Sequence, residues 1–137
     1  MNTLRRLTVT WWVTAAATCA HAGQPCDTRP AQTQDVVRGM TLAANTAARL
    51  DASGAQVVVL ARAGQDLSKY GVTWSHFGFA YRDGDGPRSH WRVVHKLNHC
   101  GTASAALYRQ GLGEFFLDQP HRYEAAYVEL TPDVQSK

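Results

Sequence analysis

The pattern of apolar positions near the start of the chain predicts one amphipathic helix over residues 33–50. Its apolar side chains recur at steps of three and four residues, which places them on one face of a helix. They are Val36, Val37, Met40, Ala43, Ala44, Ala47 and Leu50. The segment from Asp51 to Gly54 is expected to end this helix.

A short apolar run of mainly β-branched residues follows at residues 56–62. A continuous run of this kind is typical of a strand that is buried on both of its faces. Residues 64–70 are then expected to form a polar connection.

Two alternating segments at residues 73–82 and 89–97 predict an antiparallel hairpin, because the residues between them include glycines and a proline that favour a turn. Successive side chains of a strand point to opposite faces of the sheet. One face of the first arm then carries His76, Gly78 and Ala80, the other carries Phe77, Phe79 and Tyr81, and one face of the second arm carries Trp91, Val93, His95 and Leu97.

The register of this hairpin decides which side chains meet. If Arg82 lies opposite Ser89, His76 faces His95 across the two strands. A change of one residue would instead set His76 opposite Lys96.

The remaining segments predict a second helix over residues 101–110, ended by Gly111, and a last strand over residues 123–130. Phe115 and Phe116 are expected to cap the turn between them. The order helix, strand, hairpin, helix, strand predicts an α+β fold, with a small antiparallel sheet and flanking helices.

Composition adds that the chain forms one ordinary globular domain. It has 137 residues, of which 45 % are hydrophobic and 18 % are charged. The formal charge of +3 includes Arg5 and Arg6, which lie in the N-terminal segment described next. The rest of the chain is almost neutral, which argues against nucleic-acid binding.

The first 22 residues have the pattern of a secretory signal peptide. Arg5 and Arg6 precede an apolar stretch, and Ala20 to Ala22 are suited to cleavage before Gly23. We therefore expect a periplasmic or secreted protein with a single domain over residues 23–137. The apolar stretch is shorter than the roughly 20 residues of a membrane span, so no stable membrane insertion is expected after cleavage, although a retained anchor is an alternative. Lipidation of Cys19 is a further alternative, disfavoured because Thr18 is larger than the residue expected before a lipidated cysteine.

Signal cleavage would leave two cysteines, Cys26 and Cys100, in an oxidising compartment. An even number of cysteines permits one disulfide there. This pairing competes with any catalytic use of Cys100, and the sequence leaves both open.

The richest chemical cluster is Cys100 with His76 and His95. A cysteine in the first turn of the helix predicted from residue 101 would have its thiolate stabilised by the helix dipole, and a nearby imidazole could take its proton. The alternatives without catalysis are that Cys100 is buried or disulfide-bonded, and that the histidines have structural roles in the core. No cofactor is implied, and Asp83 and Asp85 are interpreted as turn formers.

A zinc site is a further alternative for the histidines around Cys100. It would draw on His90, His95, His99 and Cys100. Alternation along the strand sends His90 and His95 to opposite faces, which argues against a metal site.

The stretch from Leu60 to Phe116 resembles an uncharacterised family of exported bacterial proteins, domain-of-unknown-function family 2145. The resemblance rests on LARAGQDLSKYGVTWSHFGFAYRD, WRVVHKLNHCGT and SAALYRQGLGEFF, and extends to YEAAYVELTPDVQ. More remotely, the order His-Phe-Gly-Phe, turn, Val-Val-His is similar to the permuted NlpC-type papain-like cysteine hydrolases. That similarity implies His76 as general base, His95 as its orienting partner, Cys100 as nucleophile and nearby backbone amides as the oxyanion site.

Two features depart from the hydrolase pattern. Only four residues separate His95 from Cys100, and the family's members extend beyond the position of Lys137, so the domain is expected to be truncated. Two hypotheses follow: a thiol hydrolase or acyltransferase that acts on a peptide or acyl substrate, and a non-catalytic envelope protein with a Cys26–Cys100 disulfide. An inactive hydrolase fold with an unbridged structural Cys100 is a third.

Overall fold

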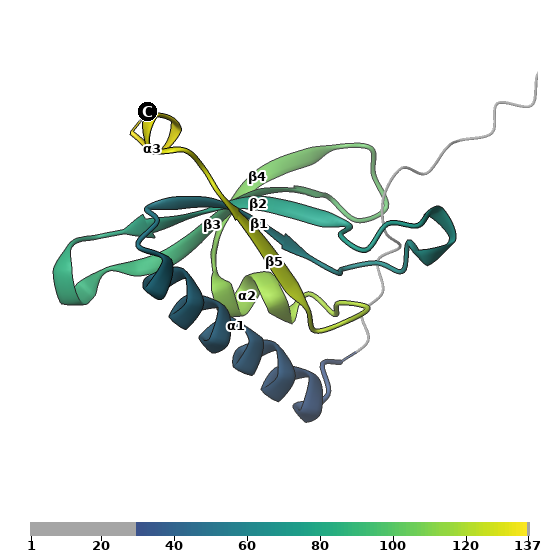
Figure 1. Ribbon diagram of the computed structural model, residues 1–137. Helices are drawn as coiled ribbons and strands as arrows, with labels where there is room; N and C mark the ends of the chain where they lie inside the picture. The colour runs from purple at the N-terminus through teal and green to yellow at the C-terminus, as the bar shows by residue number, and fades with distance from the viewer. Residues whose placement is uncertain (1–29, 137) are drawn as a thin grey trace, which may run out of the picture.

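The computed structural model describes residues 30–136, which fold into one five-stranded sheet with helices packed against it (Figure 1). The elements in chain order are α1 (Thr33–Ser53), β1 (Val57–Arg62), η1 (Ser68–Tyr70), β2 (His76–Asp83), η2 (Gly86–Arg88), β3 (His90–Asn98), β4 (Ala105–Gly111), α2 (Leu112–Leu117), β5 (Ala125–Glu129) and α3 (Pro132–Gln135). The strand order is β4-β3-β2-β1-β5, and every neighbouring pair is antiparallel. The predicted α+β class is confirmed.

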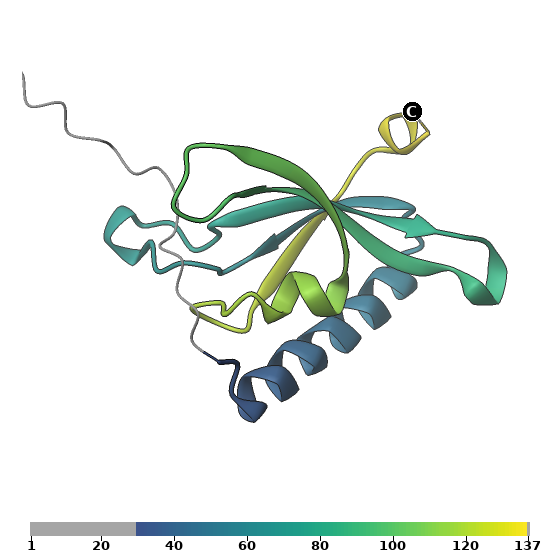
Figure 2. The same cartoon turned by 180° about the vertical axis from the view of Figure 1, so that it is seen from behind.

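Both longer helices lie on one side of the sheet, as the two opposite views show (Figures 1 and 2). The core forms between this side of the sheet and the helices. It consists of Ala43, Leu50, Ala55, Val58, Leu60, Ala80, Trp91, Val93, Leu112, Phe115 and Phe116. The helix-covered side of the sheet is the inner face, and the opposite side is the outer face.

Helix α1 begins and ends near the predicted residues, and Gly54 terminates it in the left-handed conformation with φ 74°. Its buried stripe differs from the predicted one. The buried side is Gly39, Ala43, Thr46 and Leu50, whereas Val37 and Met40 are exposed. Gly39 explains the rotation, because a Cβ there would lie 2.9 Å from Leu117 of α2, so the two helices approach along this stripe.

Strand β1 occupies the predicted segment, but the expectation that it is buried on both faces is wrong. Val58 and Leu60 point inward and are fully buried, whereas Val57 and Val59 on the outer face are partly exposed. No helix of the described residues covers that outer face (Figures 1 and 2).

The predicted hairpin of β2 and β3 forms, but its register differs from the predicted one. Arg82 pairs with Trp91 rather than with Ser89. The reason is the turn, in which Gly84 and Gly86 both have positive φ values and the 3-10 segment η2 begins at Gly86, so Ser89 belongs to the turn. The shift is an even number of residues, so each side chain keeps its predicted face.

The helix predicted over residues 101–110 is wrong, because this segment forms β4. Gly101, at φ 69°, lies in the turn after β3, and Thr102 and Ser104 hydrogen-bond to each other through their hydroxyls. The chain then returns along β3, with Asn98 paired to Ala105 and Arg92 to Gly111. Pairing with a sheet edge thus overrides the moderate helix propensity of this segment.

A short helix, α2, forms where a turn capped by phenylalanines was expected. It buries both Phe115 and Phe116 completely against the inner face. The predicted last strand is confirmed as β5.

None of the helices in residues 30–136 is both long enough and apolar enough to cross a membrane. The predictions for the signal peptide, Cys19 and Cys26 fall outside the described residues.

Candidate functional site

Two of the three predicted site residues, His76 and His95, meet on the inner face. His76 Nε2 lies 2.7 Å from His95 Nδ1, which is a hydrogen-bond distance, and the rings meet edge to face with centroids 5.0 Å apart. They come from β2 and β3 and contact each other diagonally rather than directly across the strands. Gly78 makes this possible, because a Cβ at that position would lie only 3.0 Å from the Cβ of His95.

A third polar residue, Gln110, extends this contact into a chain of hydrogen bonds. His95 Nε2 lies 2.7 Å from Gln110 Oε1. Gln110 is on β4, so its position depends on the strand that sequence reasoning interpreted as a helix. The two histidines and Gln110 are called the relay below.

The ring of Phe115 forms the floor of the relay. Its centroid lies 5.2 Å from that of His95 and 5.8 Å from that of His76. Phe115 is fully buried near the centre of α2, and beside it His95 is only 3 % exposed, whereas His76 is partly exposed.

A buried arginine completes the site beside the histidines. Arg62, at the end of β1, is only 3 % exposed and lies over the Phe115 ring at 4.8 Å. Its Nη1 donates to the Phe115 carbonyl oxygen and its Nη2 to Asp118 Oδ2, whereas its Nε is buried without a hydrogen-bond partner among the described residues. The guanidinium therefore ties the end of α2 to the sheet.

This environment disfavours the protonated form of both histidines. Burial, together with the charge of Arg62, lowers the pKa of His76 from 6.5 to about 4. Burial also lowers the pKa of His95, against the opposing effect of its hydrogen bond to Gln110. A neutral imidazole has one donor and one acceptor nitrogen, which is what a continuous relay requires.

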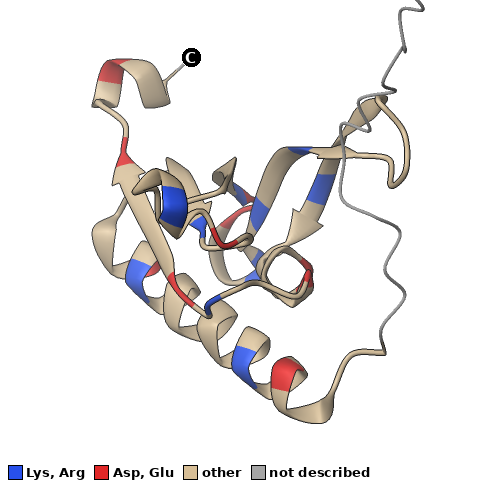
Figure 3. Ribbon diagram, turned by 90° about the vertical axis from the view of Figure 1, so that its right-hand side faces the viewer, with Lys and Arg blue, Asp and Glu red and all other residues tan. Residues whose placement is uncertain are grey.

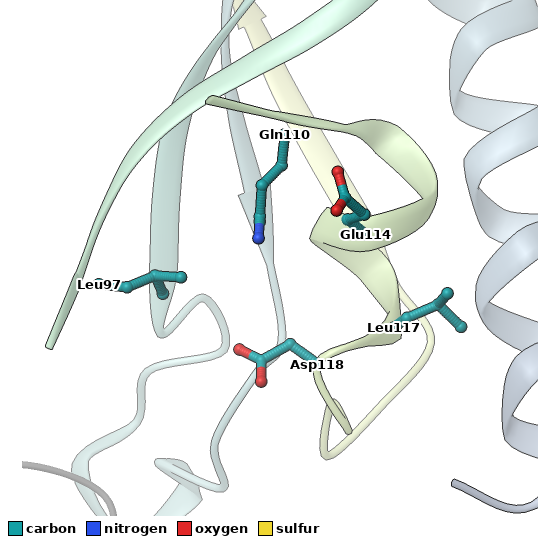
Figure 4. A pocket seen from close by; sticks show the side chains of 5 residues that line it. All are labelled: Leu97, Gln110, Glu114, Leu117 and Asp118. Carbon is teal, nitrogen blue, oxygen red and sulfur yellow. The ribbon is translucent and has the colours of Figure 1, made fainter. Parts of the chain in front are cut away.

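A cavity of about 330 Å³ borders the relay (Figure 4). It is lined by Leu97, Gln110, Glu114, Leu117 and Asp118. Glu114 is occupied within α2, because its side chain accepts a hydrogen bond from the backbone N–H of Gly111. The cavity thus connects to the histidines through Gln110 and to the buried arginine through Asp118.

The third predicted site residue, Cys100, lies in the exposed turn between β3 and β4. It is disulfide-bonded, and it is the only cysteine within residues 30–136, so its partner lies outside the described residues. The expected helix N-terminus is absent at this position, because a strand follows. No helix dipole therefore acts on the Cys100 sulfur, and its catalytic role stays a prediction.

Residues 49–137 match the model of a bacterial family described as "Uncharacterized protein conserved in bacteria (DUF2145)". The chain belongs to the DUF2145 family. The predicted resemblance is thereby confirmed, and the match includes the relay, Arg62 and the residues that line the cavity. No curated protein and no solved structure matches the chain.

The opposite face of this DUF2145 member carries a second, exposed polar cluster. Asp83 accepts from Arg109 Nη2, and Arg92 and His90 lie 3.6 and 3.5 Å from the same carboxylate oxygen. His90 and His95 therefore lie on opposite faces, as predicted. Charged residues are distributed over several elements (Figure 3), and no three His, Cys, Asp or Glu residues of the described range are grouped as a metal site would require.

Sequence reasoning missed three residues of the DUF2145 site, namely Arg62, Gln110 and Asp118. The sequence could have indicated Arg62, because it is a charged residue at an inward position of an otherwise apolar strand. It could not have indicated Gln110 and Asp118, since their roles depend on β4 and α2, which the local pattern did not indicate.

Proposed function

We propose that this DUF2145 member is an exported, non-catalytic binding protein whose domain is cross-linked by a disulfide between Cys26 and Cys100. The observation that carries this proposal is that Cys100 is disulfide-bonded. Its partner must be Cys19 or Cys26, because the chain has three cysteines, and Cys19 lies within the expected signal peptide. The N-terminal pattern supports export to an oxidising compartment, where such a bridge persists.

A bridge at this position would serve stability rather than catalysis. A sulfur held in a disulfide has no thiolate to attack a substrate. Closing a loop from residue 26 to residue 100 is worth about 4 kcal/mol in the chain-entropy description of disulfides. That contribution is large for a sheet whose outer face has no helix over it.

Intact-mass analysis of the full chain expressed with its own leader tests this proposal. Protein recovered from the periplasm is expected to begin at Gly23, to resist alkylation by iodoacetamide, and to gain two hydrogen atoms on reduction. Digestion without reductant should release one peptide pair that joins Cys26 to Cys100. Two alkylated thiols without reductant, or a mature chain that retains Cys19 in the bridge, would contradict the proposal.

A variant of Cys26 tests whether this residue is the disulfide partner of Cys100. Cys26→Ser should leave one thiol per chain that alkylates without reductant, and peptide mapping should locate it at Cys100. Protection of Cys100 in this variant would mean that its partner is not Cys26.

A second candidate function is thiol hydrolysis, and the relay is the observation that favours it. His76 held by His95 resembles a general base with its orienting partner, the arrangement that activates a cysteine nucleophile. In this version a thiol reductant first opens the disulfide, the Cys100 sulfur then attacks the carbonyl carbon of a peptide or acyl group, and water or an acceptor nucleophile later releases the acyl group from the sulfur. The histidine takes the thiol proton and returns it to the leaving group.

Alkylation kinetics separate this candidate from the binding proposal. After reduction, the rate of Cys100 alkylation is measured across pH in the wild type and in His76→Gln. A hydrolase predicts fast reaction at neutral pH that slows in the variant. A thiol that reacts no faster than free cysteine in both proteins excludes the nucleophile role.

A further inference from the structure

Gln110 has two functional ends that face different parts of the molecule. Its Oε1 faces His95 Nε2 at 2.7 Å, inside the relay. Its Nε2 makes no hydrogen bond to any residue of the range 30–136, and the side chain reaches into the cavity with this nitrogen at its tip (Figure 4). The cavity therefore contains an unused pair of amide N–H donors.

The same amide sets the direction of the relay. An amide oxygen can only accept, so His95 Nε2 must carry the hydrogen that it donates. A neutral His95 then has a lone pair on Nδ1, which accepts from His76 Nε2. Neutral His76 is left with its lone pair on Nδ1. One amide orientation thus fixes the protonated nitrogen of both histidines.

The other walls of the cavity indicate what could bind there. Asp118 uses Oδ2 for Arg62, and no residue of the described range donates to its Oδ1. Leu97 and Leu117 supply apolar surface. A donor from Gln110, an acceptor from Asp118 and apolar walls are complementary to a peptide group with its carbonyl oxygen, its N–H and an adjoining apolar side chain.

We propose that this cavity binds a peptide group of an apolar segment, with Gln110 donating to its carbonyl oxygen while Gln110 Oε1 holds His95 and His76 in their Nε2–H forms. This inference rests on the proposed binding function and names its ligand class. Gln110 is the positioning residue of the histidine pair and a binding residue of the cavity. Asp118 Oδ1 accepts from the N–H of the ligand.

The first measurement reads the tautomers of the histidine rings by nitrogen NMR of the full, bridged chain at about pH 8, where unperturbed imidazoles are neutral. In the wild type, both His76 and His95 are expected to carry hydrogen on Nε2. In Gln110→Glu a carboxylate oxygen still accepts from His95, so both tautomers should be retained. In Gln110→Met the acceptor is lost, and a mixture of tautomers is expected. Nδ1–H forms in the wild type would overturn the proposed direction.

The second measurement titrates the same samples with N-acetylleucine N-methylamide, which carries peptide groups beside an apolar side chain. In the wild type, the side-chain amide signals of Gln110 and the His95 ring signals are expected to shift and to saturate. Gln110→Glu removes the donor and should weaken binding about tenfold, the usual effect of losing one hydrogen bond, although its tautomers are unchanged. Gln65→Glu, an exposed glutamine outside this cavity, is the matched control and should bind as the wild type does.

The outcomes separate this inference from the proposed function. Absence of saturable binding in a chain whose Cys100 bridge is intact by mass overturns the peptide-group inference alone. Equal binding by wild type and Gln110→Glu overturns the role of Gln110. Saturable binding in a chain that proves to lack the Cys26–Cys100 bridge overturns the proposal of a cross-linked domain and leaves the site intact.

Discussion

The two faces of the sheet carry similar residue types in opposite environments. On the inner face, an arginine and two histidines contact the fully buried ring of Phe115, and the arginine pairs with an aspartate. On the outer face, Asp83 gathers two arginines and a histidine, and Phe77 and Phe79 are each 55 % exposed. Arg62 and His95 are thus almost fully buried on the inner face, where His76 is partly buried and Asp118 stays half exposed, whereas no member of the outer cluster is buried.

The difference teaches that burial, rather than composition, gives this site its chemical character. Away from water an unpaired polar group is costly, so the polar groups of this site have partners of fixed direction, with Arg62 Nε as the exception among the described residues. The relay and the Arg62 contacts therefore have one arrangement. On the outer face, water can replace any partner, so the ion pairs around Asp83 contribute little to stability and specify no proton position.

The largest difference in stability between the two faces is expected when one phenylalanine on each face is replaced by alanine. Phe115→Ala removes the floor of the relay and leaves a cavity, so we expect a loss of about 4 kcal/mol in the free energy of unfolding. Phe79→Ala removes a ring that is already half in water, and a loss below about 1 kcal/mol is expected. Urea unfolding of the bridged proteins, followed by tryptophan fluorescence, measures both.

The shape of the unfolding curves checks the interpretation of this pair. Similar slopes in both variants would show that the two proteins unfold from comparable structures. Equal losses in the two variants would mean that the outer phenylalanines are covered in solution, and the contrast between faces would then fail.

Sequence patterns predicted which residues share a face but not which residues touch. The alternation through β2 and β3 placed His76 and His95 on the same side, and this held although the register was wrong. Side chains alternate between the two faces of a strand, so a register shift of two residues leaves every side chain on its predicted face. The residues that contact each other across the strands depend instead on the turn geometry, which places Ser89 outside the strand.

The part of the site contributed by β4 and α2 was beyond local reasoning. Residues 101–110 include Ala, Leu, Arg and Gln, which favour a helix when considered alone. Their strand conformation comes from pairing with β3, a contact that no short window contains. Gln110 and Asp118 were therefore missed, although the histidines that they support were found.

Lowering the pH is expected to destabilise the protein through the inner-face histidines, with a smaller effect than that of Phe115→Ala. Folded His76 takes up a proton only near pH 4, whereas the unfolded chain does so near pH 6.5, so the unfolded state binds more protons between these values. The free energy of unfolding should therefore fall as the pH drops from about 6.5 to about 4, by less than about 3 kcal/mol because partial exposure of His76 screens the effect, and level off below. His95 shifts in the same direction and adds to the loss.

Variants isolate this effect from the titration of carboxylates. His76→Gln keeps an N–H donor for His95 but cannot be protonated, so its stability should depend less steeply on pH in this window. His90→Gln on the outer face should keep the wild-type slope. A His76→Gln slope equal to that of the wild type would mean that the buried pair does not resist protonation.

The smallest difference in stability between the two faces is expected when either of two arginines that pair with aspartates is replaced. Arg62→Met keeps an apolar stem over Phe115 but leaves the Phe115 carbonyl oxygen without its donor, and a loss of about 2 kcal/mol is expected. Arg109→Met on the outer face removes exposed contacts to Asp83 and Tyr81 and should leave stability unchanged within error. Because Arg62 also lowers the pKa of His76, Arg62→Met should raise that pKa, measured by NMR titration, whereas Arg109→Met should not. A stability loss without a pKa change would show that Arg62 holds α2 in place without acting on the histidines.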